Sequence, residues 1–171
     1  MPSNVEIKAR VHDIEQLMQN AKELSQSEGS LILQEDIFFN VQHGRLKLRN
    51  FMNGSGQLIF YDRPDVSGPK LSNYSISPTE DPDGLTKLLS DALGVRGVVK
   101  KQRYLFMIEQ TRLHVDTVEG LGHFMELEVV LNDEQTPDEG DSIAHTLMEK
   151  LQVKKEDLVT GAYIDILLAN K

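Results

Sequence analysis

Residues 4–11 read Asn4-Val5-Glu6-Ile7-Lys8-Ala9-Arg10-Val11, and polar and apolar side chains alternate along the whole stretch. A period of two is typical of a β-strand, in which successive side chains point to opposite faces of the sheet. One face of this strand would carry Glu6 and Lys8, and the other Val5 and Ile7. We predict a strand whose apolar face packs against a core and whose charged face meets a polar environment.

Later segments repeat this alternation and again place charged residues on one face. These residues are Arg45, Lys47, Arg49, Lys101, Arg103, Arg112, His114, Asp116, Glu126 and Glu128. One such strand alone is typical of a solvated sheet edge, but several of them could pack their apolar faces against helices. If the sheet then closes, the charged faces converge on a polar interior.

Helix and turn signals separate the alternating segments. Asp13 stands at capping-box spacing from Gln16, so a helix is expected to follow it, and helical spacing predicts further helices over residues 85–93, 143–151 and 162–169. Turn residues at 42–44, 53–56 and 120–122 predict hairpins, whereas residues 78–84 are expected to be irregular. These signals predict a single α+β domain over residues 1–171 that is dominated by antiparallel strands.

Composition restricts the class of protein. The chain has 171 residues, of which 26% are charged and 39% hydrophobic, which suits one soluble globular domain. Its formal net charge of −9 argues against nucleic acid as the partner, because nucleic-acid phosphates bind basic surfaces. Cysteine is absent, which excludes disulfides and thiolate chemistry. No apolar signal region and no run of membrane-spanning length is present, so we expect a cytoplasmic protein without a membrane partner.

Two sets of opposite charge emerge from the alternating segments. The acidic set is Glu6, Asp116, Glu126 and Glu128, and the basic set is Arg45, Lys47, Arg49, Lys101 and Arg103, with Arg10 and Arg112 as outer candidates. Glu126 and Glu128 would lie about 7 Å apart on one strand face, which allows both to reach the same hard cation. Arginine and lysine suit phosphate oxygens. The two sets predict a site for a metal–polyphosphate complex, and the alternative is salt bridging on a solvated sheet face.

The same residues resemble the motifs of the CYTH domain or triphosphate tunnel metalloenzyme superfamily, which includes class IV adenylate cyclases and thiamine triphosphatases. The family's opening Glu-x-Glu-x-Lys resembles residues 4–8, and its Leu-Arg-x-Arg strand resembles Leu46-Lys47-Leu48-Arg49. Its Lys-x-Arg strand matches Lys101-Gln102-Arg103. Its Leu-Gly-x-Phe-x-Glu-x-Glu segment matches residues 121–128, after Asp116, and its closing Ser-Tyr-x-x-Leu-Leu resembles residues 162–167. Five motifs in order cover nearly the whole chain, so the resemblance implies an α+β fold: an antiparallel closed β-barrel of about eight strands with helices packed outside.

Four positions depart from the family's pattern. The first glutamate of the opening motif is Asn4, and the lysine of a Lys-x-Pro segment is Asp62, so that only the adjacent Arg63 is left to supply a charge there. A basic residue near the C-terminus is replaced by Gly161. The tyrosine that thiamine triphosphatases pair with the opening lysine corresponds to Phe38, which argues against that version of the mechanism.

The resemblance implies hydrolysis of an organic or inorganic triphosphate that depends on Mg²⁺ or Mn²⁺, by a monomer or homodimer that binds a small phosphorylated substrate. The implied phosphate contacts are Arg45, Lys47, Arg49, Arg63, Lys101 and Arg103; the implied metal ligands are Glu6, Asp116, Glu126 and Glu128. Lys8 would activate water or add a phosphate contact. Two alternatives stay open: a class IV adenylate cyclase with the ribose 3′-hydroxyl as nucleophile, and a protein that binds phosphates without catalysis.

Overall fold

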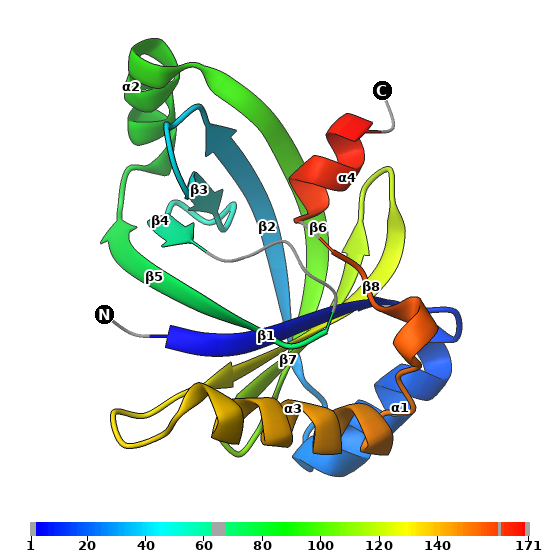
Figure 1. Cartoon of the computed structure of the whole chain (residues 1–171). Helices are drawn as coiled ribbons and strands as arrows, with labels where there is room; N and C mark the ends of the chain where they lie inside the picture. Colours follow the sequence, from blue (N-terminus) through cyan, green and yellow to red (C-terminus); the bar gives the residue numbers. More distant parts are fainter. Residues whose placement is uncertain (1–2, 63–67, 161, 170–171) are drawn as a thin grey trace.

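Eight antiparallel strands close into a barrel (Figure 1) in the computed structural model, which describes residues 3–62, 68–160 and 162–169. The strands are β1 (Ser3–Arg10), β2 (Ser30–Phe39), β3 (Arg45–Asn50), β4 (Gly56–Asp62), β5 (Lys70–Thr79), β6 (Val95–Ile108), β7 (Thr111–Val118) and β8 (Gly122–Val130). Their order around the barrel is β1-β5-β4-β3-β2-β6-β7-β8, and the pairing of β8 with β1 completes the ring. The predicted closed antiparallel barrel is confirmed.

Hairpin turns set much of this order. β2 pairs with β3, β3 with β4 and β7 with β8, as the turn residues predicted. In the first of these turns Gly44 has a φ of 64°, and a Cβ there would meet the Phe60 ring at 2.7 Å, so the turn requires glycine. The strand registers place Lys8 opposite Glu126 and Arg103 opposite Asp116. Residues of opposite charge on neighbouring strands are thereby brought side by side.

Helices lie outside the barrel, as predicted. They are α1 (Ile14–Ser25), α2 (Pro82–Leu93), α3 (Pro137–Lys150), α4 (Tyr163–Ala169) and the 3₁₀ turn η1 (Lys155–Asp157). Asp13 caps α1 by accepting a 3.1 Å hydrogen bond from the Gln16 N–H, which is the predicted cap. In Figure 1, α1 and α3 lie together at one end of the barrel, and α2 and α4 lie at the other. None of the helices in the described part of the chain has the length and apolar character needed to cross a membrane.

The outward-facing apolar side chains of the strands form the main core with α1 and α3. This core contains Ile7, Ala9, Leu17, Ala21, Phe106, Leu113, Val115, Met125, Leu127, Leu147, Met148 and Leu151. The alternate residues of the same strands, such as Lys8, His114 and Glu126, line the interior instead. The apolar faces therefore pack against helices, and the charged faces converge inside the barrel.

Residues 78–84, which were expected to be irregular, contain the end of β5 and the start of α2. Pro78 pairs with Gln57 of β4. In the described residues β1 pairs with β5 only over residues 70–73, so Pro78 lies on a free edge, where its missing N–H is tolerated. Asp81 then accepts a 3.1 Å hydrogen bond from the Gly84 N–H and starts α2 at Pro82 rather than at residue 85.

Replacement of Phe106 by alanine tests the core between β6 and α1. The Phe106 side chain is 0% exposed and its ring lies against Gly29, so truncation leaves a cavity. We expect Phe106→Ala to lower the free energy of unfolding by about 3–5 kcal/mol in urea titrations. Leu88→Ala on α2 is the control, because Leu88 is 63% exposed and should change stability little. Similar losses in both variants would contradict this placement of the core.

Candidate functional site

The barrel interior holds a polar cavity of about 340 Å³, a volume within the range of small-molecule sites. Among the described residues its cationic lining side chains are Lys8, Lys47, Arg49, Lys101, Arg103 and Arg112, and its carboxylates are Glu6, Asp36, Glu126 and Glu128. Six cations therefore face four carboxylates, although the whole chain carries a net charge of −9. The interior is positive inside an acidic protein, which suits an anionic guest.

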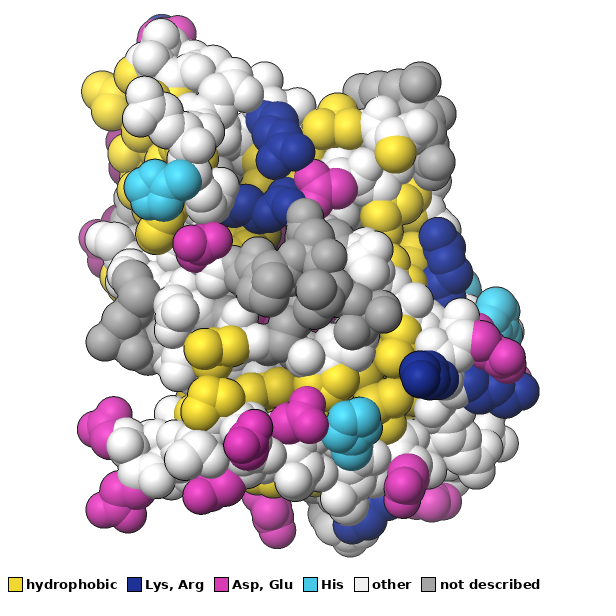
Figure 2. All heavy atoms as spheres, in the orientation of Figure 1, with side chains coloured by type: hydrophobic (Ala, Val, Ile, Leu, Met, Phe, Trp, Pro, Cys, Tyr) yellow, Lys and Arg dark blue, Asp and Glu magenta, His cyan; other side chains and the backbone are white. Residues whose placement is uncertain are grey.

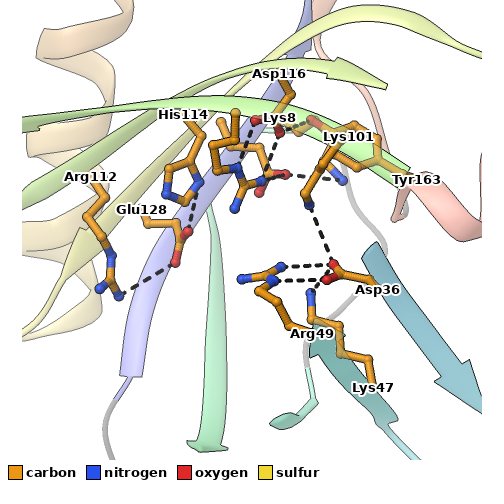
Figure 3. A network of polar contacts seen from close by, with 12 residues as sticks. Lys8, Asp36, Lys47, Arg49, Lys101, Arg112, His114, Asp116, Glu128 and Tyr163 are labelled. Carbon is orange, nitrogen blue, oxygen red and sulfur yellow. Dashed lines mark hydrogen bonds and ion pairs between the residues drawn. The ribbon is translucent and has the colours of Figure 1, made fainter. Parts of the chain in front are cut away.

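One group of charges, the Asp36 cluster, joins β2, β3 and β6. Arg49 donates two hydrogen bonds of 2.9 Å, from Nε and Nη2, to the two carboxylate oxygens of Asp36. Lys47 Nζ lies 3.3 Å from Asp36 Oδ2, and Lys101 Nζ lies 3.6 Å from the same oxygen. Figure 3 shows all three cations directed at the one carboxylate, which is 1% exposed. The cluster thus has an excess of positive charge that a further anion would balance.

Burial and these neighbours shift the pKa values of the cluster. Burial alone would raise the pKa of Asp36, but its three cationic partners, Arg49 most strongly, hold that pKa well below its usual value. Burial, with repulsion from Arg49, lowers the pKa of Lys47 to about 7. Burial and Arg103 lower the pKa of Lys101 to about 8. Both lysines therefore titrate near neutral pH, and an anion bound beside them would raise both pKa values.

A second group, the Arg103 cluster, joins the strands on the other side of the cavity to α4. Arg103 donates from Nε and Nη2 to the two carboxylate oxygens of Asp116, each at 2.8 Å, and Nη2 lies 3.3 Å from Glu126 Oε1. The Tyr163 hydroxyl donates a 2.7 Å hydrogen bond to Asp116 Oδ2. Lys8 Nζ lies 3.8 Å from Glu126 Oε1 and 3.9 Å from the centre of the Tyr163 ring. The first residue of α4 therefore reaches into the barrel.

The charge states of the Arg103 cluster also depend on burial and on neighbouring charges. Burial opposes ionisation of Asp116, but Arg103 outweighs it and leaves the pKa of Asp116 at about 2. Lys8 and Arg103 likewise outweigh the burial of Glu126 and hold its pKa well below the usual value. Burial and the neighbouring Asp116 raise the pKa of Tyr163 well above its usual value. At neutral pH both carboxyl groups are ionised and the phenol is protonated.

A third group surrounds Glu128 at the edge of the cavity. Asn4 Nδ2 donates a 3.2 Å hydrogen bond to Glu128 Oε2, and Arg112 Nη2 lies 3.9 Å from that oxygen. His114 Nδ1 lies 3.0 Å from Glu128 Oε1. Burial, with repulsion from Arg103, lowers the pKa of His114 to about 4, so its imidazole is neutral at neutral pH.

The side chains around Glu128 fit a divalent metal ion. Donor atoms of His114, Glu126 and Glu128 all lie within 4.8 Å of one another. Glu6 lines the same cavity and faces Glu128 across the β1–β8 pair. Neutral imidazole and ionised carboxylate are the states in which these groups bind metals. The residues present could therefore hold such an ion at this wall of the cavity.

Most of the residues proposed from the sequence lie in this one cavity. They are Glu6, Lys8, Lys47, Arg49, Lys101, Arg103, Glu126 and Glu128. Asp116 is 0% exposed and is not part of the cavity lining, because Arg103 and Tyr163 cover it. Arg63 lies outside the described residues.

Arg45 begins the strand that carries Lys47 and Arg49, but its side chain contacts α4. Its Nη2 lies 2.5 Å from Asp165 Oδ2, and Arg96 Nη2 lies 2.8 Å from Asp165 Oδ1. These ion pairs anchor α4, whose Tyr163 lines the cavity.

Figure 2 shows Lys and Arg side chains gathered in a hollow of this face, between the regions where Figure 1 places α2 and α4.

Three residues of the site, Asp36, His114 and Tyr163, were given no role from the sequence, although His114 was counted among the charged residues of an alternating strand. Asp36 and His114 alternate in step with lumen residues of their own strands, Phe38 and Arg112, so the period of two carried a signal for both. Tyr163 lies on a helix, and no strand periodicity could place it inside the barrel.

Comparisons with known proteins agree with this architecture. The model of the CYTH domain family matches residues 3–163. A relative from Methanocaldococcus jannaschii, named "putative adenylate cyclase", is 26% identical over 95% of this chain and 97% of its own length. The PH1012 protein of Pyrococcus horikoshii has a solved structure with a TM-score of 0.83 and 24% identity, covering 95% of this chain and 98% of that one. A Pyrococcus furiosus structure reaches a TM-score of 0.82 at 22% identity, with the same coverage of both chains. Because the family model spans nearly the whole sequence, this protein belongs to the CYTH domain family.

Proposed function

We propose that this protein hydrolyses a triphosphate, inorganic or organic, with the help of a divalent metal ion, Mg²⁺ or Mn²⁺. The observation that carries the proposal is that one cavity brings Lys47, Arg49 and Lys101 of β3 and β6 together with Glu126 and Glu128 of β8. Phosphoryl transfer needs this combination, because positioning and charge neutralisation supply most of its catalysis. Membership of the CYTH family, which includes triphosphatases and cyclases, supports the same class of substrate.

The proposed phosphate contacts are the cations that retain free donors. Arg49 uses Nε and Nη2 on Asp36, which leaves Nη1 for a ligand, and each lysine ammonium has three donors. Lys101 stands between the two clusters, because it contacts Asp36 and lies 5.1 Å from the Tyr163 ring centre. A phosphate chain along this wall would meet Lys47, Arg49 and Lys101 in turn.

The other wall would hold the metal and the reacting phosphate. Glu126 and Glu128, with Glu6 beside them, are proposed to bind the ion, which would polarise the phosphoryl group and lower the pKa of a bound water. Asp116 is proposed to fix the Arg103 guanidinium through two hydrogen bonds rather than to bind the metal. Lys8, between Glu126 and the Tyr163 ring, would stabilise negative charge on the transferred phosphate.

Two other functions share this geometry. The relative from Methanocaldococcus jannaschii named "putative adenylate cyclase" favours a cyclase, in which the ribose 3′-hydroxyl replaces water as nucleophile. Asn4 and Asp62, which replace charged residues of the family's pattern, favour a protein that binds phosphates without catalysis. ATP with Mg²⁺ or Mn²⁺ separates all three. A hydrolase releases phosphate, a cyclase releases pyrophosphate and cyclic AMP, and a binding protein is stabilised without turnover.

For the hydrolase we expect release of phosphate from tripolyphosphate or ATP that stops in EDTA. Glu126→Gln and Glu128→Gln should each lower the rate at least about 100-fold, because they remove charge from the proposed metal ligands while keeping their shape. Full activity in EDTA would show that the reaction needs no divalent metal ion. Cyclic AMP as the product would show that the protein is a cyclase and not a hydrolase.

Lys101→Ala tests the cationic wall. We expect it to weaken tripolyphosphate binding about tenfold or more, because a charge-assisted hydrogen bond contributes about 1.5–3 kcal/mol. The matched control is Lys100→Ala, since Lys100 is the next residue of β6 and is exposed on the outer face. Calorimetric titration compares the two variants. Equal weakening in both would mean that only net charge matters and that the lumen is not the binding site.

Asp36→Asn tests the counter-charge of the same wall. Removal of this buried carboxylate leaves its three cations uncompensated, so we expect the free energy of unfolding to fall by about 3–5 kcal/mol. Tripolyphosphate should stabilise this variant more than it stabilises the unmodified protein, since the anion replaces the lost charge. Glu35→Gln, one residue away and on the outer face of β2, should alter neither quantity much. Thermal unfolding with and without tripolyphosphate measures the loss of stability and the stabilisation by the anion. Equal shifts in Asp36→Asn and Glu35→Gln would contradict the role of Asp36 as a counter-charge.

The pKa of Lys47 predicts proton uptake on binding. At pH 8 a group with a pKa of about 7 is mostly neutral, and a bound phosphate would raise its pKa and recharge it. At pH 6 Lys47 is already charged, so its contribution should vanish. We expect the unmodified protein to take up more protons than Lys47→Met when tripolyphosphate binds at pH 8, by at most about one, and the difference should shrink at pH 6. Calorimetry in buffers of different ionisation enthalpy measures this difference, and equal uptake by both proteins at pH 8 would contradict it.

A further inference from the structure

The acidic set taken from the sequence contains only oxygen ligands, but one member is committed elsewhere. Both carboxylate oxygens of Asp116 accept hydrogen bonds from Arg103 at 2.8 Å, and Oδ2 also accepts one from Tyr163 at 2.7 Å. Asp116 is 0% exposed and does not line the cavity. A metal ion could reach it only by breaking these bonds and leaving the Arg103 guanidinium without its partner. Asp116 is therefore a poor metal ligand in this barrel.

The side chain of His114 lies close to the other carboxylates and can serve as a ligand in place of Asp116. His114 lies two residues before Asp116 on the same face of β7, opposite Glu126 of β8 in the strand register. Its Nδ1 lies 3.0 Å from Glu128 Oε1, and donor atoms of His114, Glu126 and Glu128 fall within 4.8 Å of one another. Two ligands bound at right angles to one ion, each about 2.1 Å away, are about 3.0 Å apart. The spacing therefore suits a single ion.

Two buried polar atoms at this wall have no hydrogen-bond partner among the described residues. One is Nδ1 of His114, which is 5% exposed and whose contact with Glu128 is not aligned as a hydrogen bond. The other is Oδ1 of Asn4, which is 2% exposed, while Nδ2 of the same side chain donates to Glu128. Both side chains line the cavity. A buried polar atom without a partner is costly, so both atoms are suited to contact a ligand bound in the cavity.

We propose that His114, Glu126 and Glu128, with the Asn4 side-chain oxygen as a fourth donor, form a mixed nitrogen and oxygen site that selects a divalent transition metal ion over Mg²⁺. Mg²⁺ favours oxygen ligands and water, whereas an imidazole nitrogen suits Fe²⁺ or Zn²⁺; Mn²⁺ binds more weakly than these ions but still accepts a nitrogen ligand more readily than Mg²⁺. This inference rests on the proposed function in that it specifies the metal of the same reaction. It replaces Asp116 by His114 in the ligand set.

The surrounding charges set a limit on the affinity of this site. Lys8 lies 3.8 Å and Arg103 3.3 Å from Glu126 Oε1, and Arg112 lies 3.9 Å from Glu128 Oε2 (Figure 3). These cations repel a metal ion, so the two carboxylates are partly neutralised before it binds. Polyphosphate entering the cavity would neutralise the same cations. We therefore expect Mn²⁺ and tripolyphosphate to bind more tightly together than separately, as linked ligands do.

Pulsed EPR of the Mn²⁺-loaded protein tests the nitrogen ligand without any variant and without turnover. Imidazole bound directly to Mn²⁺ gives a ¹⁴N hyperfine coupling that a site of carboxylate, amide oxygen and water does not give. We expect this coupling in the protein with Mn²⁺ and tripolyphosphate. Its absence would overturn the proposal even if the protein hydrolyses triphosphates. Conversely, coupling without any turnover would uphold the metal site and refute the proposed reaction.

Metal titrations of variants test the selectivity. His114→Gln should abolish the ¹⁴N coupling. It should weaken Mn²⁺ binding about tenfold or more and change Mg²⁺ binding little, so that the ratio of Mn²⁺ affinity to Mg²⁺ affinity falls. His123→Gln is the control, since His123 is exposed on β8 and its Nδ1 contacts the Thr117 hydroxyl instead. Free Mn²⁺ is counted by its EPR signal, with Mg²⁺ as competitor. Equal weakening of Mn²⁺ and Mg²⁺ by His114→Gln, or unchanged Mn²⁺ binding, would overturn the proposal.

Discussion

The pairing of buried charges is the constraint on which the interior of this barrel depends. A charged side chain inside a protein is costly unless a partner of opposite charge and good geometry lies beside it. Asp36 and Asp116 are such partners on the two sides of the cavity. Asp36 accepts two hydrogen bonds from Arg49, and Asp116 accepts two from Arg103. The carboxylates that are 0–1% exposed thus serve as internal counter-ions, whereas Glu126 and Glu128 line the cavity.

The same constraint explains why the interior stays positive while the protein as a whole is acidic. Fewer carboxylates than cations line the cavity. The excess of positive charge lies where water and an anion can enter. An acidic exterior repels long polyanions such as nucleic acids, whereas a short phosphate chain needs only to fit the cavity. Size and charge together therefore favour a small phosphorylated molecule over a polymer.

The alternation of residues 4–11 and of the later strands predicted which side chains share a face, because strand periodicity is a local property of the sequence, whereas closure of the barrel was predicted from the family resemblance. The pairing of those side chains is not local. Arg103 and Asp116 meet through the β6–β7 register, and Arg45 is drawn to Asp165 because α4 returns to the start of β3. Tyr163 enters the barrel for the same tertiary reason. Periodicity indicated which residues face inward, but only the packing of α4 and the registers show which of them remain available to a ligand.

The surroundings of Lys8 bear on how a phosphate would be attacked. The family resemblance aligns Phe38 with a tyrosine of thiamine triphosphatases, but the aromatic ring beside Lys8 belongs to Tyr163. The Tyr163 hydroxyl donates to Asp116, and its raised pKa keeps the phenol protonated, so it cannot accept a proton from water. Lys8 is a cation beside Glu126 and an aromatic face, which suits the stabilisation of developing negative charge. In the proposed reaction, activation of the nucleophile would therefore fall to the metal ion held by Glu126 and Glu128, whether the nucleophile is water or a ribose hydroxyl.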